Sequence, residues 1–290
     1  MSRCAPAVAA LGGGHGLAAT LRAARRFAGH VTAVVSVADD GGSSGRLRRQ
    51  LGIAPPGDLR KCLVALAEEG SPLAVAFEHR LEGDEEEGHP VGNLVIAGLA
   101  VATGSLQTAL DEAGRLLGAV GRVVPAAGEP VVLKAEADGG EIEGQSAVQR
   151  TAHISRVSLV PADPPASPEA IAAVEGADMV VIGPGSLFTS VLAALAVPAL
   201  AEAVGRSRAR RVYVANLRPQ PAETAGYDVA AHVEALAAHG VEVDVVLADT
   251  TAINLGTVRA PVVETRLART DGGPGHDPAR LAAALEGLVG

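Results

Sequence analysis

The chain repeats one order of elements: an apolar run, a glycine-rich or polar turn and a helix-like segment. The apolar runs predict strands at 6–11, 31–37, 177–183, 211–217 and 242–248. The periodic segments predict helices at 16–28, 58–69, roughly 90–117, 228–239 and 277–288. Such alternation is typical of βαβ units, whose right-handed crossovers build a mostly parallel sheet covered by helices. We therefore expect an α/β fold, with ligands bound beyond the carboxyl ends of the strands.

One segment, at about 119–160, departs from this order. It alternates apolar and polar residues with a period of two and contains GEP and DGGE turns. This pattern favours antiparallel strands joined by short turns. We expect a small antiparallel β insert within one domain that spans 1–290.

The charge and composition limit the kinds of partner. The chain has 24 basic and 33 acidic residues, a formal net charge of −9, and only 2% aromatic residues. An acidic chain poor in aromatics lacks both the basic surface and the stacking platforms that nucleic-acid polymers need. A local basic cluster at Arg46, Arg48, Arg49, Arg60 and Lys61 suits a small anionic ligand better.

The two cysteines, Cys4 and Cys62, have no metal-ligand spacing and are expected to be reduced thiols. The apolar stretch Ala5–Leu11 is too short to span a membrane and is followed at once by glycines. We expect a cytoplasmic protein without a membrane span.

The glycine loop after the first strand predicts phosphate binding. Gly12, Gly13, Gly14 and Gly16 lead into a helix, and their backbone N–H groups can face an anion at its N-terminus. No Gly-Lys-Ser/Thr follows, so this is not a Walker A loop, and Leu17 stands where a dinucleotide fingerprint has its third glycine or alanine. The alternative is a plain tight turn between strand and helix.

A second loop, VADDGGSSGRLRR at 37–49, follows the second strand directly. Its candidate ligand-binding residues are Asp39, Asp40, Gly41, Gly42, Ser43, Ser44, Arg46 and Arg48. The acids suit a ribose hydroxyl or a divalent cation, and the hydroxyls, backbone N–H groups and guanidinium groups suit phosphate oxygens. The alternative is a capped turn with solvated arginines. Two such loops on neighbouring strands favour a real site.

Two further segments carry polar residues that the pattern leaves ambiguous. In PPGDLR, Asp58 either caps the following helix or points with Arg60 into the cleft. In GHPVGN, His89 is a contact, a general base or a structural histidine, and Asn93 is a candidate contact to a base or sugar.

Two later strands also end in polar loops. Gly185 and Ser186 lie in GPGSLFTS, a strand–turn–helix unit. Tyr227 lies in the loop after the strand at 211–217, where its ring either stacks on a base or sugar or packs in the core. The chain contains no cluster with metal-ligand spacing, and its strand-end loops favour an extended phosphorylated ligand.

The chain contains six motifs in this order: GGGHGL, VADDGGSSGRLR, PPGDLR, GHPVGNL, IGPGSLFTS and QPAETAGY. Together they resemble the motifs of the bacterial gluconeogenesis factor family, whose relatives include phospholactate transferase. The resemblance runs from about residue 8 to about 250. It implies a Rossmann-like fold, UDP-sugar binding, and a link to gluconeogenic growth, cell shape and cell-wall precursor supply. It matches the ligand-binding positions Gly12–Gly14, Gly16, Asp39, Asp40, Asp58, Asn93, Gly185, Ser186 and Tyr227.

The sequence also departs from the family pattern. His15 stands where a threonine is common, and Phe188 replaces a frequent tyrosine. Arg218 stands where a threonine or methionine is usual, and Gly275 occupies a position that is commonly basic. The last change weakens a role of the C-terminal tail in clamping phosphate.

These observations leave three functions open. The first is a regulator that binds a nucleotide sugar such as UDP-N-acetylglucosamine or UDP-glucose, without a certain cofactor, and that works through self-association or a protein partner. The second is a transferase that moves a phospholactyl group from a nucleotide-activated donor to a deazaflavin precursor, with Asp40 and Asp58 holding Mg²⁺. The third, a nicotinamide oxidoreductase, fits the glycine spacing poorly.

Overall fold

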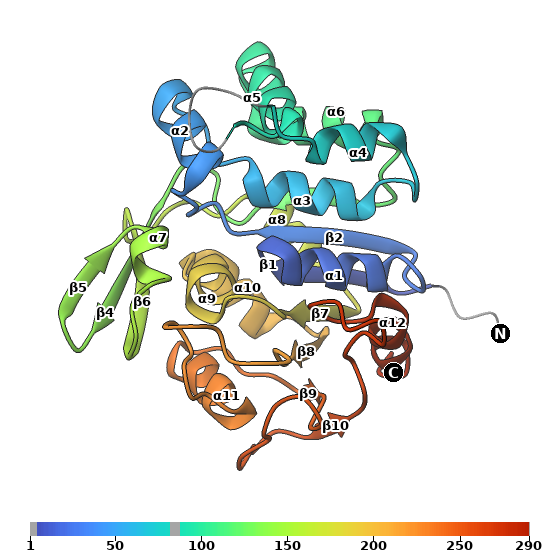
Figure 1. Cartoon of the computed structure of the whole chain (residues 1–290), viewed down its shortest axis with the longest axis vertical. Helices are drawn as coiled ribbons and strands as arrows, with labels where there is room; N and C mark the ends of the chain where they lie inside the picture. Colours follow the sequence, from blue (N-terminus) through green and yellow to red (C-terminus); the bar gives the residue numbers. More distant parts are fainter. Residues whose placement is uncertain (1–4, 82–87, 290) are drawn as a thin grey trace.

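A seven-stranded parallel sheet forms the centre of the molecule (Figure 1). The computed structural model describes residues 5–81 and 88–289. The strands lie in the order β10 (Val262–Glu264), β9 (Val245–Ala248), β8 (Arg210–Val214), β7 (Met179–Ile182), β1 (Ala7–Gly12), β2 (His30–Val35) and β3 (Arg122–Pro125). The predicted α/β class with a mostly parallel sheet is confirmed.

Helices pack around this sheet. They are α1 (Gly14–Ala24), α2 (Gly42–Leu51), α3 (Gly57–Leu66), α4 (Pro72–Glu78), α5 (Val91–Thr103), α6 (Leu106–Leu116), α8 (Pro168–Glu175), α9 (Leu192–Leu195), α10 (Pro198–Arg206), α11 (Val229–Ala238) and α12 (Pro278–Glu286), with the π-helix η1 (Leu187–Val191) leading into α9. Helix α1 contacts both α3 and α12 (Figure 1).

The middle strands are covered on both faces. In β1 and β7 every residue from Val8 to Leu11 and from Met179 to Ile182 is at most 2% exposed. A strand that is buried on both sides reads as a continuous apolar run, which explains why the sequence showed these strands clearly. Strand β10, with two exposed residues among its three, gave no such signal.

The antiparallel insert is smaller than predicted. Strands β4 (Val132–Ala137), β5 (Gly140–Glu143) and β6 (Ile154–Val160) form a three-stranded antiparallel sheet that projects from the body, with α7 (Gln145–Val148) beside it (Figure 1). The expected start at 119 was wrong, because Arg122–Pro125 pairs in parallel with β2 and belongs to the main sheet. Arg122–Pro125 has only four residues, too few for their alternation to distinguish a parallel from an antiparallel strand. That the whole chain is one domain stays a prediction.

The long helix predicted at roughly 90–117 is two helices. Gly104 ends α5 in the left-handed conformation, with φ of 67°. Ser105 then caps α6, since its side chain accepts a hydrogen bond from the N–H of Thr108.

None of the helices in the described residues is by itself long and apolar enough to cross a membrane, and one sharply bent pair, Leu187–Leu195 with Pro198–Arg206, meets the criterion by length and composition alone.

Candidate functional site

The order of the strands reverses at the centre of the sheet. The chain runs outward from β1 to β2 and β3, then returns to β7 on the other side of β1 and continues to β8 and β9. At such a reversal the loops that leave two neighbouring strands diverge, and a crevice opens beyond their carboxyl ends. The turns after β1 and β7 therefore meet at the point where an α/β sheet usually binds its ligand.

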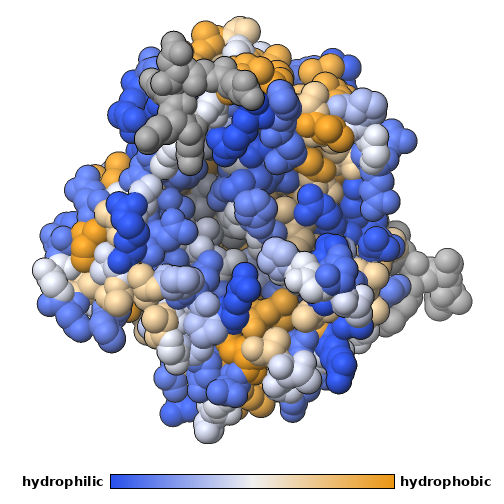
Figure 2. Space-filling view, viewed as in Figure 1, coloured by the Kyte–Doolittle hydropathy of each residue, from blue (hydrophilic) through white to orange (hydrophobic). Residues whose placement is uncertain are grey.

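A cleft of about 350 Å³ lies at this point. Its walls are Gly13, Gly14, His15, Gly16, Asp39, Asp58, Lys61, Gln145, Gln149, Gly185, Ser186, Ser190 and Gln220. Figure 2 shows this face of the molecule hollowed near its centre, with mostly hydrophilic residues around the hollow. The structure thus brings the glycine turns after β1 and β7 together with Asp39 from the loop after β2.

The first glycine turn brings the backbone of α1 to the cleft. Gly14 has φ of 63°, which favours glycine, and a Cβ on Gly16 would lie 2.2 Å from the carbonyl oxygen of Pro184. Gly13 is the N-cap residue and carries no side chain that could cap the helix. Because the first N–H groups of a helix have no partner within it, this turn offers donors to an anion.

The two acids after β2 have different surroundings. Asp39 lines the cleft and accepts a hydrogen bond from the N–H of Gly41 at 3.0 Å. Burial raises the pKa of its carboxyl group above the usual range, and the nearby Asp58 adds to this. Asp40 instead accepts hydrogen bonds from the N–H and the hydroxyl group of Ser146, and it is not among the lining residues.

Four of the predicted contacts form a buried polar network behind the cleft. Asn93 donates from Nδ2 to the Ser43 hydroxyl at 3.0 Å, and Ser43 Oγ lies 2.7 Å from Nδ1 of His89. Arg60 donates from Nε to Oδ1 of Asn93 at 3.0 Å and forms an ion pair with Glu78 at 2.6 Å.

Arg60 is 4% exposed and Asn93 is 1% exposed, so both are occupied within the protein and neither lines the cleft. Ser44 likewise accepts from the N–H of Gly57 at 3.1 Å. This network fixes the first turn of α2 against α3 and α5. Arg46 and Gly12 also lie outside the residues that line the cleft.

The first turn of α3 adds an ion pair at the cleft wall. Lys61 Nζ lies 3.0 Å from Oδ1 of Asp58, and both residues line the cleft. Burial, followed by the Lys61 ammonium group, lowers the pKa of His15. His15 is therefore neutral near pH 7, and the two acids outnumber the single ammonium group in the cleft.

The turn after β7 is held by the loop after β8. Asn216 clamps Gly185 with two hydrogen bonds, accepting from its N–H at 2.9 Å and donating to its carbonyl oxygen at 2.8 Å. Gln220 donates from Nε2 to the Ser186 hydroxyl at 2.9 Å. These bonds explain why polar side chains follow β8 in the sequence.

Glu223 of the ETAGY motif has a structural position. It is 1% exposed and accepts hydrogen bonds from the N–H groups of Phe188 and Thr189, at 2.6 and 3.1 Å. Burial raises the pKa of this carboxyl group. Tyr227 packs edge-on against Phe188 and His232, with ring centroids 6.4 and 5.5 Å apart, and it does not line the cleft.

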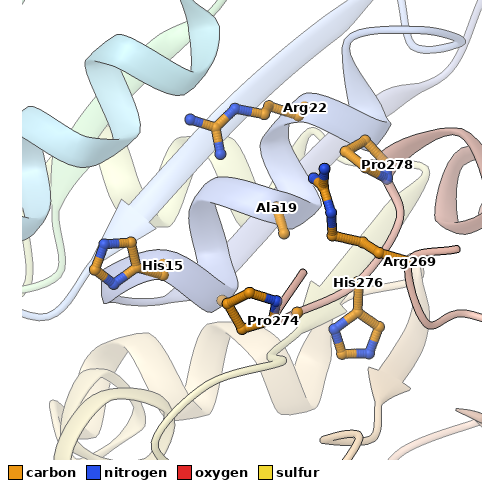
Figure 3. Close-up of a pocket in the computed structure, with 9 residues that line it drawn as sticks. His15, Ala19, Arg22, Arg269, Pro274, His276 and Pro278 are labelled. Carbon is orange, nitrogen blue, oxygen red and sulfur yellow. The ribbon is translucent and has the colours of Figure 1, made fainter. Parts of the chain in front are cut away.

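A second cavity of about 490 Å³ adjoins the cleft, because His15 and Gly16 line both (Figure 3). Its other walls are Ala19, Arg22, Arg269, Pro274, Gly275, His276 and Pro278. It brings two guanidinium groups together with apolar surface from α1 and the C-terminal segment. Arg269 is also paired with Asp271.

Sequence analysis placed Lys61 in the basic cluster and Ser190 in the GPGSLFTS unit, but it missed four other residues of the cleft: His15, Gln145, Gln149 and Gln220. Gln220 lies in the loop after a predicted strand, which is a signal that was available. Gln145 and Gln149 belong to the insert, and nothing in the sequence shows that α7 folds back to the sheet edge. The described residues contain no group of three or more His, Cys, Asp or Glu side chains that could hold a metal ion.

The sheet order and the cleft at its switch point define a doubly wound α/β protein. A family model described as 2-phospho-L-lactate transferase CofD matches residues 8–280, and the chain belongs to this CofD family.

Three individual proteins show which group within this family is similar to the chain. A Mycobacterium tuberculosis protein, provisionally named a gluconeogenesis factor, is 45% identical over 97% of this chain and 90% of its own length. The gluconeogenesis factor of Bacillus subtilis is 43% identical over 81% of this chain and 75% of its own length. The crystal structure of a UPF0052 family member from Bacillus halodurans covers 96% of this chain and 98% of its own, with a TM-score of 0.89 and 35% identity. The resemblance stated from the motifs is confirmed.

Proposed function

We propose that this protein is a cytoplasmic regulator that binds a nucleotide sugar of the UDP-N-acetylglucosamine type and links its supply to gluconeogenic growth, cell shape and cell-wall precursors. The observation that carries the proposal is the pair of cavities that meet at the N-terminus of α1. A nucleotide sugar has two bulky ends joined by a diphosphate. Two adjoining cavities with a helix N-terminus between them match that division.

The second cavity supplies what the nucleoside end requires. Pro274, Pro278 and Ala19 give apolar surface, and the Arg269 side chain reaches from the C-terminal segment toward α1 (Figure 3). Arg22 lines the cavity from α1, with its guanidinium group turned away from the C-terminal segment (Figure 3). Guanidinium groups pair with phosphate oxygens and stack on flat rings. Arg22 and Arg269 take the charge-balancing role that the sequence assigned to Arg46 and Arg60.

Calorimetry with UDP-N-acetylglucosamine tests the proposal. A His15→Asp variant introduces a negative charge at the first turn of α1, where a carboxylate is favourable to the helix. The same charge opposes a diphosphate. We expect binding to weaken by at least about tenfold in His15→Asp and by less than about threefold in the neutral control His15→Asn. If the wild-type protein gives no heat at millimolar ligand, or both variants bind like wild type, the proposal is wrong.

A second function, phospholactyl transfer with Mg²⁺, has one observation in its favour. Asp39 and Asp58 both line the cleft, and Mg²⁺ in phosphate sites is commonly held by one or two carboxylates together with the substrate. These two acids would hold the ion, and the ion would balance charge on a leaving phosphate. Asp40, which the sequence favoured for this role, is bonded to Ser146 instead. Product formation from a nucleotide-activated phospholactate and a deazaflavin, followed by mass spectrometry, distinguishes the enzyme from the regulator.

A further inference from the structure

One part of the cleft wall is made of side-chain amides. Gln145 lies on α7 and Gln149 is its C-cap residue, while Gln220 comes from the loop after β8. The hydroxyl groups of Ser186 and Ser190 line the cleft with them. Amides and hydroxyls both donate and accept hydrogen bonds without a net charge, which suits a ligand group that also does both.

Gln220 has hydrogen-bonding capacity left over at this wall. Its Nε2 donates to Ser186, and its backbone N–H donates to the Thr224 hydroxyl at 2.8 Å. Its Oε1 is buried and has no hydrogen-bond partner among the residues that the structure describes. Burying a polar atom without a partner costs free energy, so a turn of this amide that brings Oε1 to a ligand hydroxyl or N–H in the cleft would remove an existing penalty.

The charges at this wall disfavour a second anionic group. Asp39 and Asp58 line the same cleft, and the Lys61 ammonium group is already 3.0 Å from Asp58. The two guanidinium groups of Arg22 and Arg269 lie in the neighbouring cavity instead. Asp58 Oδ2 also lies against the glycine turn, 2.6 Å from the position of a Cβ on Gly13, so the cationic groups that can face a diphosphate lie on the side of the second cavity. The amide wall is matched by an uncharged part of the ligand that carries hydroxyl groups.

We infer that Gln145, Gln149 and Gln220 form the subsite that reads the sugar of the nucleotide sugar, and that the antiparallel insert is the specificity element of this protein. This inference rests on the proposed function. It assigns to the insert a role that the glycine turns cannot have, since backbone N–H groups recognise the diphosphate shared by all such ligands. The insert is fixed in place for this role by the two hydrogen bonds from Ser146 to Asp40.

The test compares UDP-N-acetylglucosamine with UDP, which lacks the sugar and ends in a free phosphate. Calorimetry gives the affinities of the full chain for UDP-N-acetylglucosamine and UDP, and their ratio measures how much the sugar contributes. In wild type this ratio is expected to exceed about tenfold. Replacing both Gln145 and Gln149 by alanine is expected to lower the ratio by at least about fivefold, as expected for lost neutral hydrogen bonds. Gln50→Ala, an exposed glutamine on α2, is the matched control and retains the wild-type ratio.

A second ligand pair tests the charge argument without any mutation. UDP-glucuronate carries a carboxylate where UDP-glucose has a hydroxymethyl group. Because Asp39 and Asp58 face the same cleft, we expect UDP-glucuronate to bind at least about fivefold more weakly. Equal binding of these two ligands, or a wild-type ratio in the double glutamine variant, overturns the inference while the proposed function stands. Absence of binding by UDP and every UDP-sugar overturns both.

Discussion

Asp40 holds Ser146 across 106 positions of the chain, because one carboxylate oxygen, Oδ1, accepts from its N–H at 2.9 Å and from its hydroxyl at 2.7 Å. Asp40 precedes the second glycine turn, and Ser146 lies on α7 of the insert. This pair ties the small antiparallel sheet to the carboxyl edge of the large one. It places the two glutamines of α7 at the cleft.

Replacing Asp40 by alanine removes both bonds and is expected to loosen the insert. We expect a loss of about 1–3 kcal/mol in the free energy of unfolding and faster hydrogen exchange at residues 132–160. Ser155→Ala, also in the insert, removes only a bond from an exposed hydroxyl to the carbonyl oxygen of Glu136 and is the control. Unchanged exchange in the Asp40 variant would show that the insert is held by other contacts.

Replacing glycine by alanine is expected to have opposite effects on stability at two helical positions, Gly16 and Gly98. A Cβ on Gly16 would meet the Pro184 carbonyl oxygen at 2.2 Å, so Gly16→Ala is expected to destabilise the protein by about 1–3 kcal/mol. Gly98, on α5, has nothing within 4 Å of the added Cβ. Gly98→Ala is therefore expected to stabilise by up to about 1 kcal/mol. Chemical denaturation measures both, and equal effects would contradict the close packing at Gly16.

Glu223 has a buried carboxylate, and its substitution by alanine is expected to lower the stability of the protein more than its substitution by glutamine. Glu223→Ala leaves the N–H groups of Phe188 and Thr189 without their acceptor and is expected to cost on the order of 2 kcal/mol or more. Glu223→Gln keeps one acceptor oxygen and is expected to cost less. Thermal melting compares the three proteins. An alanine variant as stable as wild type would refute the capping role of this side chain.

His276 predicts a loss of stability in mild acid. It is 6% exposed, its Nε2 lies 3.1 Å from the carbonyl oxygen of Ala215, and burial lowers its pKa to about 4. Since an unfolded histidine titrates near 6.5, only the unfolded chain binds the proton between pH 6.5 and 4. The free energy of unfolding is therefore undiminished above pH 6.5 and decreases as the pH is lowered from 6.5 to 4, by about 3 kcal/mol in all.

His276→Gln, which keeps an N–H donor, removes this titration. Unfolding free energies of the wild type and of the His276→Gln variant, measured from pH 7 to pH 4, are expected to differ in slope in this window. Parallel curves would contradict the shifted pKa.

The parallel sheet was predictable because its inner strands are buried on both faces and read as unbroken apolar runs. Which of the polar residues line the cleft was not predictable from the sequence. Asp39 and Asp40 are adjacent and chemically identical, yet one lines the cleft and the other bonds to an element that comes 106 positions later. Arg60 was expected at the cleft, but its buried guanidinium group pairs with Glu78, an exposed residue on α4, a helix absent from the prediction.

A crystal structure of the full chain with UDP-N-acetylglucosamine would locate the ligand relative to the glycine turn after β1. We expect the diphosphate within hydrogen-bonding distance of the backbone N–H groups of Gly14, His15 and Gly16, and the sugar against Gln145 and Gln149. A ligand bound elsewhere, with residues 13–16 making no contact to its phosphates, would refute the proposed binding site.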